Sequence, residues 1–224
     1  MNIAACTVPG TIAITFDDGP FIYTSALLDL LDRYGAKVTF FVNGDNFGKI
    51  REAPYPDMLW RMVHAGHQIG SHTWNHADLN AISSDDRRSQ MASIEQLTAE
   101  MFGAIPTYMR PPYGNCNAAC LADLSALGYH VIGWNVDTLD YNNQSPSLIQ
   151  NSKNIFNNAV ANGGGGKYIS LEHDVHQYTV TSFAEYAIQN AQAKGYRVVT
   201  VGECLGDFVG NWYRDARTGA AVGR

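Results

Sequence analysis

Short apolar runs rich in β-branched and aromatic residues recur along the chain, and each has the length of a buried β-strand. The sequence predicts seven strands, at residues 11–16, 37–42, 67–70, 108–110, 130–134, 167–171 and 197–201. Between most of them apolar residues recur every three or four positions, which predicts helices at 25–34, 56–65, 83–102, 117–127, 147–161 and 181–194. Glycines just after several helical runs, and Ser83 and Ser147 at the start of two of them, are typical of helix caps.

Strands that alternate with helices predict βαβ crossovers and therefore a parallel sheet. Seven such units favour an α/β fold of the distorted (β/α)7 barrel type, closed or nearly closed, with its active site at the carboxyl ends of the strands. An open, doubly wound sheet is the alternative, although no glycine-rich nucleotide-binding motif follows the first strand. The sequence contains no internal repeat or linker, and we expect residues 1–224 to form a single catalytic domain.

Composition limits the possible partners of the protein. The net charge is −6 and Lys and Arg form no run, which argues against nucleic acid or an anionic membrane as a partner. No apolar run approaches the roughly 20 residues that are needed to span a bilayer. The N-terminus has neither the basic segment nor the long apolar segment of a secretion signal. We expect a monomer that acts on a neutral or cationic substrate.

Four cysteines bear on the compartment in which the protein works. Cys116 and Cys120 flank a short loop, while Cys6 and Cys204 lie just outside the first and last predicted strands. This arrangement favours two disulfides, Cys116–Cys120 and Cys6–Cys204, over four free thiols in a cytosolic protein. Disulfides would indicate a secreted protein, extracellular or in the cell wall, whose signal peptide has been removed. The glycosylation sequon at residues 143–145 is a pattern that also occurs often by chance.

Ionisable side chains gather where five of the seven predicted strands end. They are Asp17 and Asp18, then His72 and His76, then Arg110 and Tyr113, then Asp137 and Asp140, and finally Glu172, His173, Asp174 and His176. In parallel β/α folds the carboxyl ends of the strands meet at one rim, where active sites form. An isolated Asp-Asp-Gly-Pro segment would indicate a solvated acidic turn, but a rim this dense in Asp, His and Arg indicates catalysis.

His72 and His76 have the i, i+4 spacing that places two imidazoles on one side of a turn. With a carboxylate from the first strand end they would form a three-ligand site with open positions, as a catalytic Zn²⁺ requires. Co²⁺ or Ni²⁺ would fit the same ligands, and two His with one carboxylate also hold Fe²⁺ for oxygen chemistry. The ligand types alone therefore leave the reaction open.

Five short motifs make a resemblance to a known family specific: TFDDGP at 15–20, HTWNH at 72–76, RPPYG at 110–114, DTLDY at 137–141 and LEHD at 171–174. In this order they resemble the motifs of the polysaccharide deacetylases, the family-four carbohydrate esterases. The second and fifth motifs, the Cys116–Cys120 pair and the segment VGECLGD at 201–207 look most like fungal chitin deacetylases. The resemblance implies metal-dependent hydrolysis of the N-acetyl amide of N-acetylglucosamine units in chitin or chito-oligosaccharides.

Two enzymatic alternatives share the scaffold, an acetylxylan esterase and a peptidoglycan deacetylase, because the motifs govern the reaction and not the polymer. A catalytically dead carbohydrate-binding relative is the alternative from another class. The proton-transfer and ligand candidates are all intact, which argues against that last alternative.

The resemblance implies a role for each residue of the first three motifs. Asp18, His72 and His76 would bind the metal, and Asp17 would be the general base. Arg110 would orient that base, which suits the planar, charged guanidinium group. Zinc is the expected metal, with Co²⁺ and Ni²⁺ as the other candidates.

The fifth motif is similar to the one that carries the family's general acid. His173 would protonate the departing amine, and Asp140 would orient it, while Asp137 would have a supporting or structural role. On chemistry alone His176 is a second candidate for the acid, and only the Leu-x-His pattern favours His173. We interpret the remaining histidines as structural residues: His64, His67 and His130.

The resemblance also implies the walls of the substrate pocket. The backbone N–H of Tyr113, on a loop stiffened by Pro111 and Pro112, would stabilise the oxyanion, and Pro112 would belong to the substrate-binding residues. Leu171 would contact the acetyl methyl group, and Tyr141, where the family often has Trp, would line the groove. Trp74 would pack beneath the site, and sugar stacking would fall to exposed aromatics such as Tyr113, Tyr141 and Tyr23.

Overall fold

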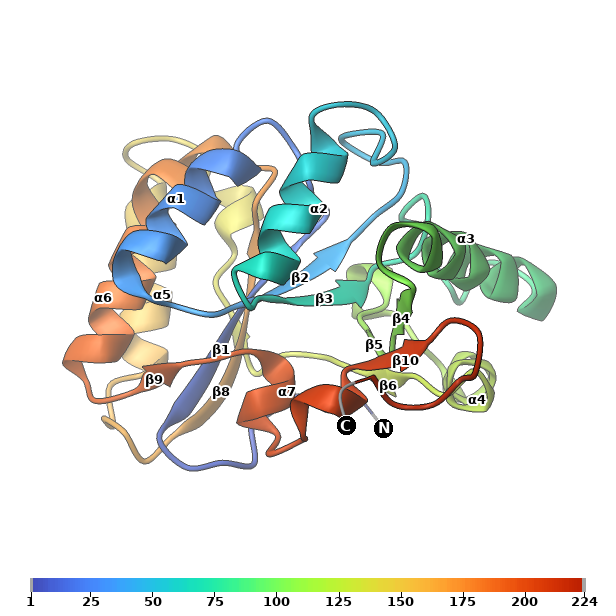
Figure 1. Ribbon diagram of the computed structural model, residues 1–224. Helices are drawn as coiled ribbons and strands as arrows, with labels where there is room; N and C mark the ends of the chain where they lie inside the picture. The colour runs from blue at the N-terminus through green and yellow to red at the C-terminus, as the bar shows by residue number, and fades with distance from the viewer. Residues whose placement is uncertain (1, 223–224) are drawn as a thin grey trace.

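The structure, a computed structural model, describes residues 2–222. Eight strands form one parallel sheet in the spatial order β6-β5-β3-β2-β1-β8-β7, with β9 beside the first residues of β1. Their bounds are β1 (Thr11–Asp17), β2 (Thr39–Val42), β3 (Gln68–Ser71), β5 (Tyr108–Met109), β6 (His130–Val131), β7 (Val136–Asp137), β8 (Lys167–His173) and β9 (Arg197–Val198). The sheet curls into a half-barrel (Figure 1), which confirms the predicted (β/α)7 type and excludes the open doubly wound sheet.

Strand β1 lies at the centre of the sheet because both of its faces are apolar. Ile12 and Phe16 pack under the outer helices, whereas Ala13 faces the interior of the half-barrel. A strand buried on both faces has the continuous apolar run by which it was predicted. The register between β1 and β8 pairs Asp17 with His173. This pairing brings the first and fifth motifs side by side at the same end of the sheet.

The segment between β6 and β7 crosses the gap between the two edges of the half-barrel. The strand predicted at 130–134 is present but shorter: β6 ends at Val131, and the chain then crosses to β7 at the opposite edge of the sheet. In the gap Ile3 pairs with Ile132, and the N–H of Asn135 donates to the carbonyl of Ile169 at 3.0 Å. The periodicity of the sequence misses this break because the apolar residues of the crossing segment are buried in the interior of the half-barrel. The segment carries Trp134 into that interior.

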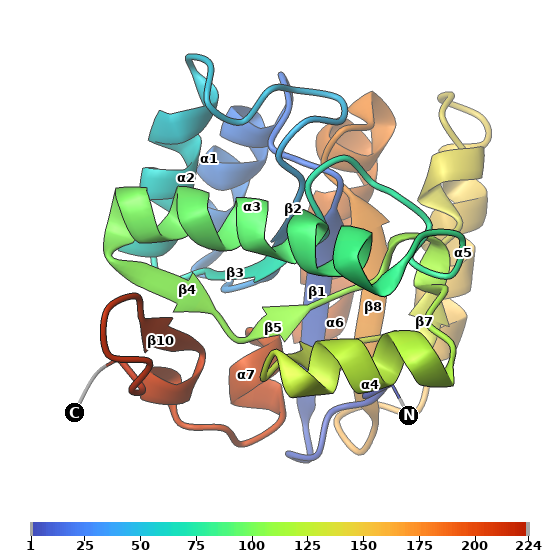
Figure 2. The same cartoon turned by 90° about the vertical axis from the view of Figure 1, so that its right-hand side faces the viewer.

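Helices cover the outer side of the sheet (Figures 1 and 2). They are α1 (Thr24–Tyr34), α2 (Tyr55–His64), α3 (Ser84–Phe102), α4 (Ala118–Ala126), α5 (Ile149–Ala159) and α6 (Ala184–Ala193), whereas the short α7 (Val201–Cys204) packs against the interior cluster that contains Ala13. Ser83 caps α3 by accepting the N–H of Asp86, as predicted, whereas the predicted cap Ser147 makes no capping bond at α5. The helix predicted at 181–194 begins instead with a π-helical turn, η3 (Thr179–Phe183).

Shorter elements complete the fold, and the sequence did not predict them. Strands β4 (Ala104–Pro106) and β10 (Tyr213–Asp215) pair in antiparallel fashion, and 3₁₀ turns occupy η1 (Pro112–Gly114), η2 (Asp140–Asn142) and η4 (Val209–Asn211). The strand predicted at 197–201 ends at Val198, since the side chain of Thr200 caps α7. Elements of two to four residues are too short to produce a periodic signal.

Both predicted disulfides are present. Cys6–Cys204 ties the N-terminal segment to α7, and Cys116–Cys120 ties the loop after β5 to α4. In the sequon, the amide of Asn143 is buried and donates to the carbonyl of Leu139 and the hydroxyl of Ser152, each at 3.0 Å. Among residues 2–222 no helix combines the length and the apolar character that crossing a membrane requires.

Candidate active site

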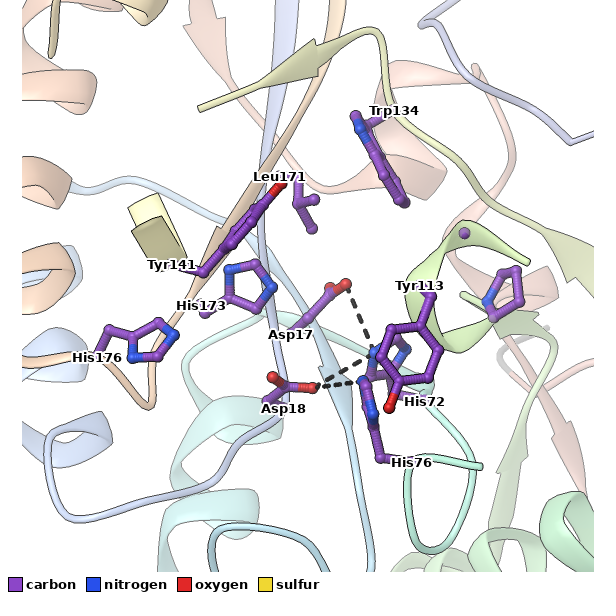
Figure 3. A pocket seen from close by; sticks show the side chains of 12 residues that line it. Asp17, Asp18, His72, His76, Tyr113, Trp134, Tyr141, Leu171, His173 and His176 are labelled. Carbon is purple, nitrogen blue, oxygen red and sulfur yellow. Dashed lines mark ion pairs between the residues drawn. The ribbon is translucent and has the colours of Figure 1, made fainter. Parts of the chain in front are cut away.

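Side chains from all five motifs converge on one pocket at the carboxyl ends of the strands (Figure 3). The pocket has a volume of about 370 Å³, which is in the range of small-molecule sites. Its lining residues are Asp17, Asp18, His72, His76, Pro111, Tyr113, Gly114, Trp134, Tyr141, Leu171, His173 and His176. The polar residues come from the ends of β1, β3 and β8, and the aromatic residues come mainly from the loops that follow β5 and β7.

Asp18, His72 and His76 form a compact cluster of possible metal ligands, with ligand atoms all within 4.8 Å of one another. Asp18 Oδ1 lies 3.5 Å from His72 Nε2 and 3.2 Å from His76 Nε2. His72 Nδ1 donates to the carbonyl of Arg110 at 2.7 Å. Because a carbonyl accepts only, this bond places the ring proton on Nδ1 and leaves the Nε2 lone pair directed at the cluster.

The charge state of the cluster also suits a cation. Burial by itself raises the pKa of Asp18, but the imidazoles of His76 and His72 outweigh this effect and lower the pKa to about 2. Burial lowers the pKa of His72, which favours its neutral, ligating form. Asp18 Oδ1 is buried and accepts no hydrogen bond within residues 2–222, an arrangement that a bound cation would satisfy.

Asp17 occupies a different environment from its neighbour. Its Oδ1 accepts a hydrogen bond from Arg110 Nη1 at 2.8 Å, and the side chain of Arg110 is fully buried. Arg110 also donates to Thr15 Oγ1 at 2.6 Å and to the carbonyl of Gly133 at 3.0 Å, and its guanidinium lies 4.4 Å from the ring centre of Phe41. With Oδ1 held in this way, Asp17 Oδ2 faces the cluster, 3.8 Å from His72 Nε2.

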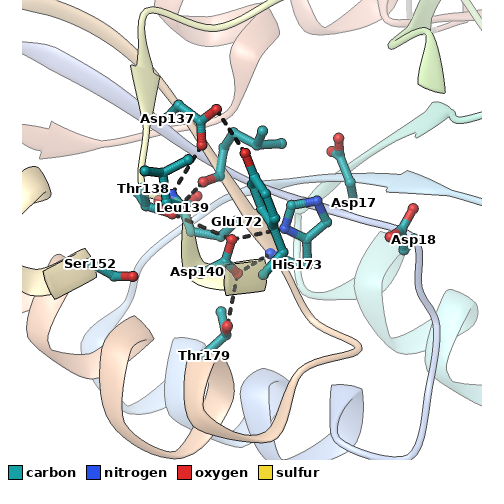
Figure 4. A network of polar contacts seen from close by, with 12 residues as sticks. Asp17, Asp18, Asp137, Thr138, Leu139, Asp140, Ser152, Glu172, His173 and Thr179 are labelled. Atoms are coloured by element: carbon teal, nitrogen blue, oxygen red, sulfur yellow. Dashed lines mark hydrogen bonds and ion pairs between the residues drawn. The ribbon is translucent and has the colours of Figure 1, made fainter. Parts of the chain in front are cut away.

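His173 lies across the pocket from His72 and His76 and is paired with a buried carboxylate (Figures 3 and 4). Its Nδ1 lies 2.9 Å from Asp140 Oδ1, and its backbone N–H donates to Asp140 Oδ2 at 2.8 Å. Burial alone lowers the pKa of His173, but the charge and hydrogen bond of Asp140 outweigh burial and raise the pKa to about 9. The imidazole is therefore protonated at neutral pH, with Nε2 free to donate into the pocket.

His176 lines the same pocket, with its ring centre 5.7 Å from that of His173. Burial lowers the pKa of His176, and within the described part of the chain no carboxylate is hydrogen-bonded to its ring. The two histidines therefore differ in the property that matters for a general acid. His173 has a carboxylate partner and His176 has none among residues 2–222.

Backbone strain is concentrated around the pocket. Among residues 2–222, five residues other than glycine have positive φ: Asp18 (76°), Thr73 (71°), His76 (58°), Tyr113 (59°) and Leu139 (52°). Such conformations cost energy for residues that have a Cβ atom, and they cluster at functional sites where the surrounding structure enforces them. Each lies in one of the five motifs.

Aromatic and apolar side chains form the walls and floor of the pocket. Tyr113 is 65% exposed and packs edge-on against His76, with ring centres 4.7 Å apart. On the other side Tyr141 packs edge-on against His173 at 5.3 Å, and Leu171 and Trp134 lie between these walls. A small apolar floor with exposed aromatic rims suits an acetamido group carried on a sugar ring.

Some predicted residues lie elsewhere. Pro111, and not the predicted Pro112, lines the pocket, because Pro112 is buried at the start of η1. Tyr23 packs against the core and does not line the pocket. Trp74 is partly buried against the core and does not line the pocket, and its ring lies so close to Gly44 that a Cβ atom there would come within 2.1 Å of it.

Four further residues that the sequence analysis singled out stand outside the pocket lining: His64, His67, His130 and Asp137. Asp137 accepts hydrogen bonds from Leu139 N–H at 3.0 Å and from the hydroxyl of Tyr141 at 3.3 Å. The sequence reasoning missed Trp134, although it ends an apolar run and so stands at the rim where the polar residues were sought.

Residues 4–132, more than half of the chain, match the family model described as polysaccharide deacetylase. The chain belongs to the polysaccharide deacetylase family. It is 49% identical over 213 residues to a chitin deacetylase of Colletotrichum lindemuthianum, and the alignment covers 95% of this chain and 86% of that protein. It is 51% identical over 212 residues to a chitin deacetylase of Pestalotiopsis sp, and this alignment covers 95% of this chain and 69% of that protein.

The solved structure of the chitin deacetylase from Colletotrichum lindemuthianum has a TM-score of 0.94 and 48% sequence identity to this chain, covering 96% of this chain and 95% of that one. The polysaccharide deacetylase family consists of metal-dependent enzymes and also includes peptidoglycan deacetylases and xylan esterases. The cluster of Asp18, His72 and His76 fits such a metal, since it offers two imidazole nitrogens and one carboxylate oxygen that accepts no hydrogen bond from the described part of the chain.

Proposed function

We propose that this protein hydrolyses the N-acetyl amide of N-acetylglucosamine units in chitin or chito-oligosaccharides, releasing acetate and leaving the free amine. The observation that carries the proposal is the placement of two proton-transfer groups around one pocket: a carboxylate held by Arg110 at Asp17 and a carboxylate-paired imidazole at His173. Amide hydrolysis needs a base to activate water and an acid to protonate the amine.

Asp18, His72 and His76 would hold a divalent cation, for which Zn²⁺ is our choice and Co²⁺ and Ni²⁺ are the alternatives. When bound, such a cation polarises a carbonyl and makes water easier to deprotonate. Asp17 is the general base in this proposal, because Arg110 fixes Oδ1 and leaves Oδ2 to take the proton from water.

His173 is the general acid. Asp140 holds Nδ1, so Nε2 points into the pocket, and the raised pKa keeps the ring protonated until the carbon–nitrogen bond breaks. Its proton goes to the departing amine. His173 Nε2 then receives a proton from Asp17 or from solvent before the next turnover.

The other lining residues orient the substrate. We assign the backbone N–H of Tyr113 to the developing oxyanion, because the positive φ of this residue fixes the direction of its peptide groups. Leu171 and Trp134 would contact the acetyl methyl group, and the exposed ring of Tyr113 and that of Tyr141 would flank the sugar. Asp137 would hold Tyr141 in place through its hydroxyl.

We further propose that the protein acts outside the cell or in the cell wall, as a monomer and as a single catalytic domain. The two disulfides and the fungal chitin deacetylases among its relatives support this location. An insoluble polymer such as chitin must be met outside the cell. The net charge of −6 is also compatible with a neutral polysaccharide or its cationic product.

Acetate release from chito-oligosaccharides, acetylated xylan and peptidoglycan fragments, measured side by side, tests the proposed substrate. We expect the highest kcat/KM on chito-oligosaccharides, and activity confined to xylan or to peptidoglycan would refute the chitin assignment. Chelation should abolish the activity and added Zn²⁺ should restore it.

An Asp17→Asn variant tests the proposed base. It should still bind one equivalent of metal, because the three ligands are unchanged, yet it should lose at least about 100-fold in kcat. An inactive wild-type protein that binds chito-oligosaccharides would instead support a carbohydrate-binding function.

A further inference from the structure

The carboxylate of Asp140 is held by more than its partner His173. Asp140 is fully buried in η2, and its Oδ2 accepts a second hydrogen bond, from the hydroxyl of Thr179 at 2.8 Å (Figure 4). Thr179 is also fully buried and is the first residue of the π-helical turn η3. None of the five motifs includes Thr179, and π-helical turns occur often at functional sites.

Hydrogen-bond donors and acceptors fix the direction of the Thr179 hydroxyl. Gln144 Oε1 accepts the backbone N–H of Tyr178 at 3.0 Å, which fixes the orientation of the Gln144 amide. Gln144 Nε2 then donates to Thr179 Oγ1 at 3.0 Å and to the backbone carbonyl of Asp140 at 2.8 Å. Because Thr179 Oγ1 already accepts from an amide, its single proton is directed to Asp140 Oδ2.

We propose that Thr179, oriented by Gln144, is a positioning residue for the general acid. Its hydroxyl fixes the Asp140 carboxylate in place and weakens the attraction between that carboxylate and the proton of His173. This inference rests on the proposed function, since it assumes that His173 protonates the leaving amine. A hydrogen bond to a carboxylate stabilises its charge and makes it a weaker acceptor for other donors. Without the Thr179 hydroxyl, His173 would hold its proton more tightly and release it more slowly.

Other charged groups also face this pair, and they determine what the experiment must hold constant. His173 faces Asp17 and Asp18 from the end of β1, and His176 from the loop after β8. It also faces the buried Asp174 that follows it in the chain and the ring of Tyr141. Asp140 faces Glu172, whose burial and proximity to Asp140 raise its pKa well above the usual value. None of these groups contacts the Thr179 hydroxyl within the described residues, so a substitution at Thr179 changes one donor to Asp140 and leaves the other charges in place.

The test is a pair of substitutions in the metal-loaded enzyme, Thr179→Val and Thr179→Ser, with a chito-oligosaccharide as substrate. Valine has nearly the shape of threonine without its hydroxyl, and serine retains the hydroxyl. We expect Thr179→Val to lower kcat about 10-fold with KM within about twofold of wild type, as the loss of one hydrogen bond to a charged group predicts. The alkaline limb of the pH profile should move to higher pH, and Thr179→Ser should restore both properties.

Thr181→Val is the matched control, because Thr181 lies on the same turn, is exposed, and donates to the carbonyl of Gln177 at 2.9 Å. It should retain the wild-type kcat and pH profile. If Thr179→Val does not fold, Gln144→Met carries the test, since it removes the donor that directs the hydroxyl, and it should move the alkaline limb in the same direction by a smaller amount.

A second readout does not depend on turnover. The imidazole of His173, followed by NMR titration, should hold its proton to higher pH in Thr179→Val than in the wild type. An unchanged titration, or a variant that loses stability while its pH profile stays the same, would show that Thr179 only satisfies a buried carboxylate and would overturn the proposal. A wild-type enzyme with no acetate release from any acetylated polymer would refute the proposed function instead, and the two failures are thereby distinguished.

Discussion

Replacing Arg110 with methionine tests whether a buried ion pair holds the proposed base in place. The side chain of Arg110 is fully buried and that of Asp17 is 3% exposed, with Nη1 and Oδ1 2.8 Å apart. Methionine keeps the apolar contact with Phe41 but leaves Asp17 buried without its partner. Asp17 would also lose the group that directs Oδ2 toward the pocket.

The magnitude follows from the burial of both charges. Removing one partner of a buried ion pair typically costs about 3–5 kcal/mol of unfolding free energy, because the remaining charge is not neutralised. Asp17→Asn should fall in the same range, since it leaves the guanidinium of Arg110 without a counter-ion. The double variant leaves no unpaired charge, so its cost should be smaller than the sum of the single costs by about 3 kcal/mol. In kcat, Arg110→Met should lose at least about 100-fold.

Urea denaturation of the four proteins in one buffer, with acetate release measured in parallel, gives both quantities. The matched control is Arg51→Met, which removes an exposed ion pair to Glu100 of nearly equal length, 2.7 Å, with both side chains 47% exposed. Exposed pairs contribute about 0–1 kcal/mol, so the control should be almost as stable as the wild type. If Arg110→Met lowered the free energy of unfolding as little as the control does, or if the costs of the two single variants simply added, burial would not be what makes this ion pair costly to break.

Three further predictions concern the disulfides, the pH dependence of stability and the choice between two histidines. Replacing Cys6 and Cys204 together with serine should lower the free energy of unfolding by about 5 kcal/mol, and replacing Cys116 and Cys120 should lower it by about 2 kcal/mol. The difference follows from their sequence separations of 198 and 4 residues, and denaturant titrations measure both values. Burial, with a contribution from a nearby lysine, lowers the pKa of His67 from 6.5 to about 4 in the folded protein. As the pH falls, the imidazole is protonated in the unfolded chain before it is protonated in the folded one. The free energy of unfolding should therefore decrease by about 3 kcal/mol between pH 6.5 and pH 4. Denaturation of His67→Asn across this range should show a flatter dependence, and an equal slope would contradict the assignment. In steady-state assays His176→Asn should lose less than about tenfold in kcat and His173→Asn at least about 100-fold, and the reverse order would make His176 the acid.

Much of the fold was predictable because it depends on local pattern. The apolar runs of β1 and β8 and the helical spacing of α1 and α3 each predict their own element, and Ser83 caps α3 as its residue type suggests. The prediction failed where an apolar run did not mean one continuous strand, as between β6 and β7. It also failed for elements of two to four residues, such as β4 and β10, which have too few positions to show a period.

The sequence by itself determined which chemical groups the protein carries and at which end of the strands they stand. Asp17, Asp18, His72 and His173 lie within two residues of the ends of predicted strands, and parallel strands must present such residues at one rim. The local order of residues is enough for this conclusion, because strand direction and helix connection together fix the rim.

Tertiary structure alone decided the different surroundings of those groups. Asp17 and Asp18 are chemically identical neighbours, and they differ because Arg110, from a distant strand, meets one while His72 and His76 surround the other. Likewise Thr179, with no motif of its own, is brought to Asp140 by the turn that follows β8. A hydrogen bond or a shifted pKa depends on burial and on partners far along the chain, and these exist only when the sheet has curled and the loops have met.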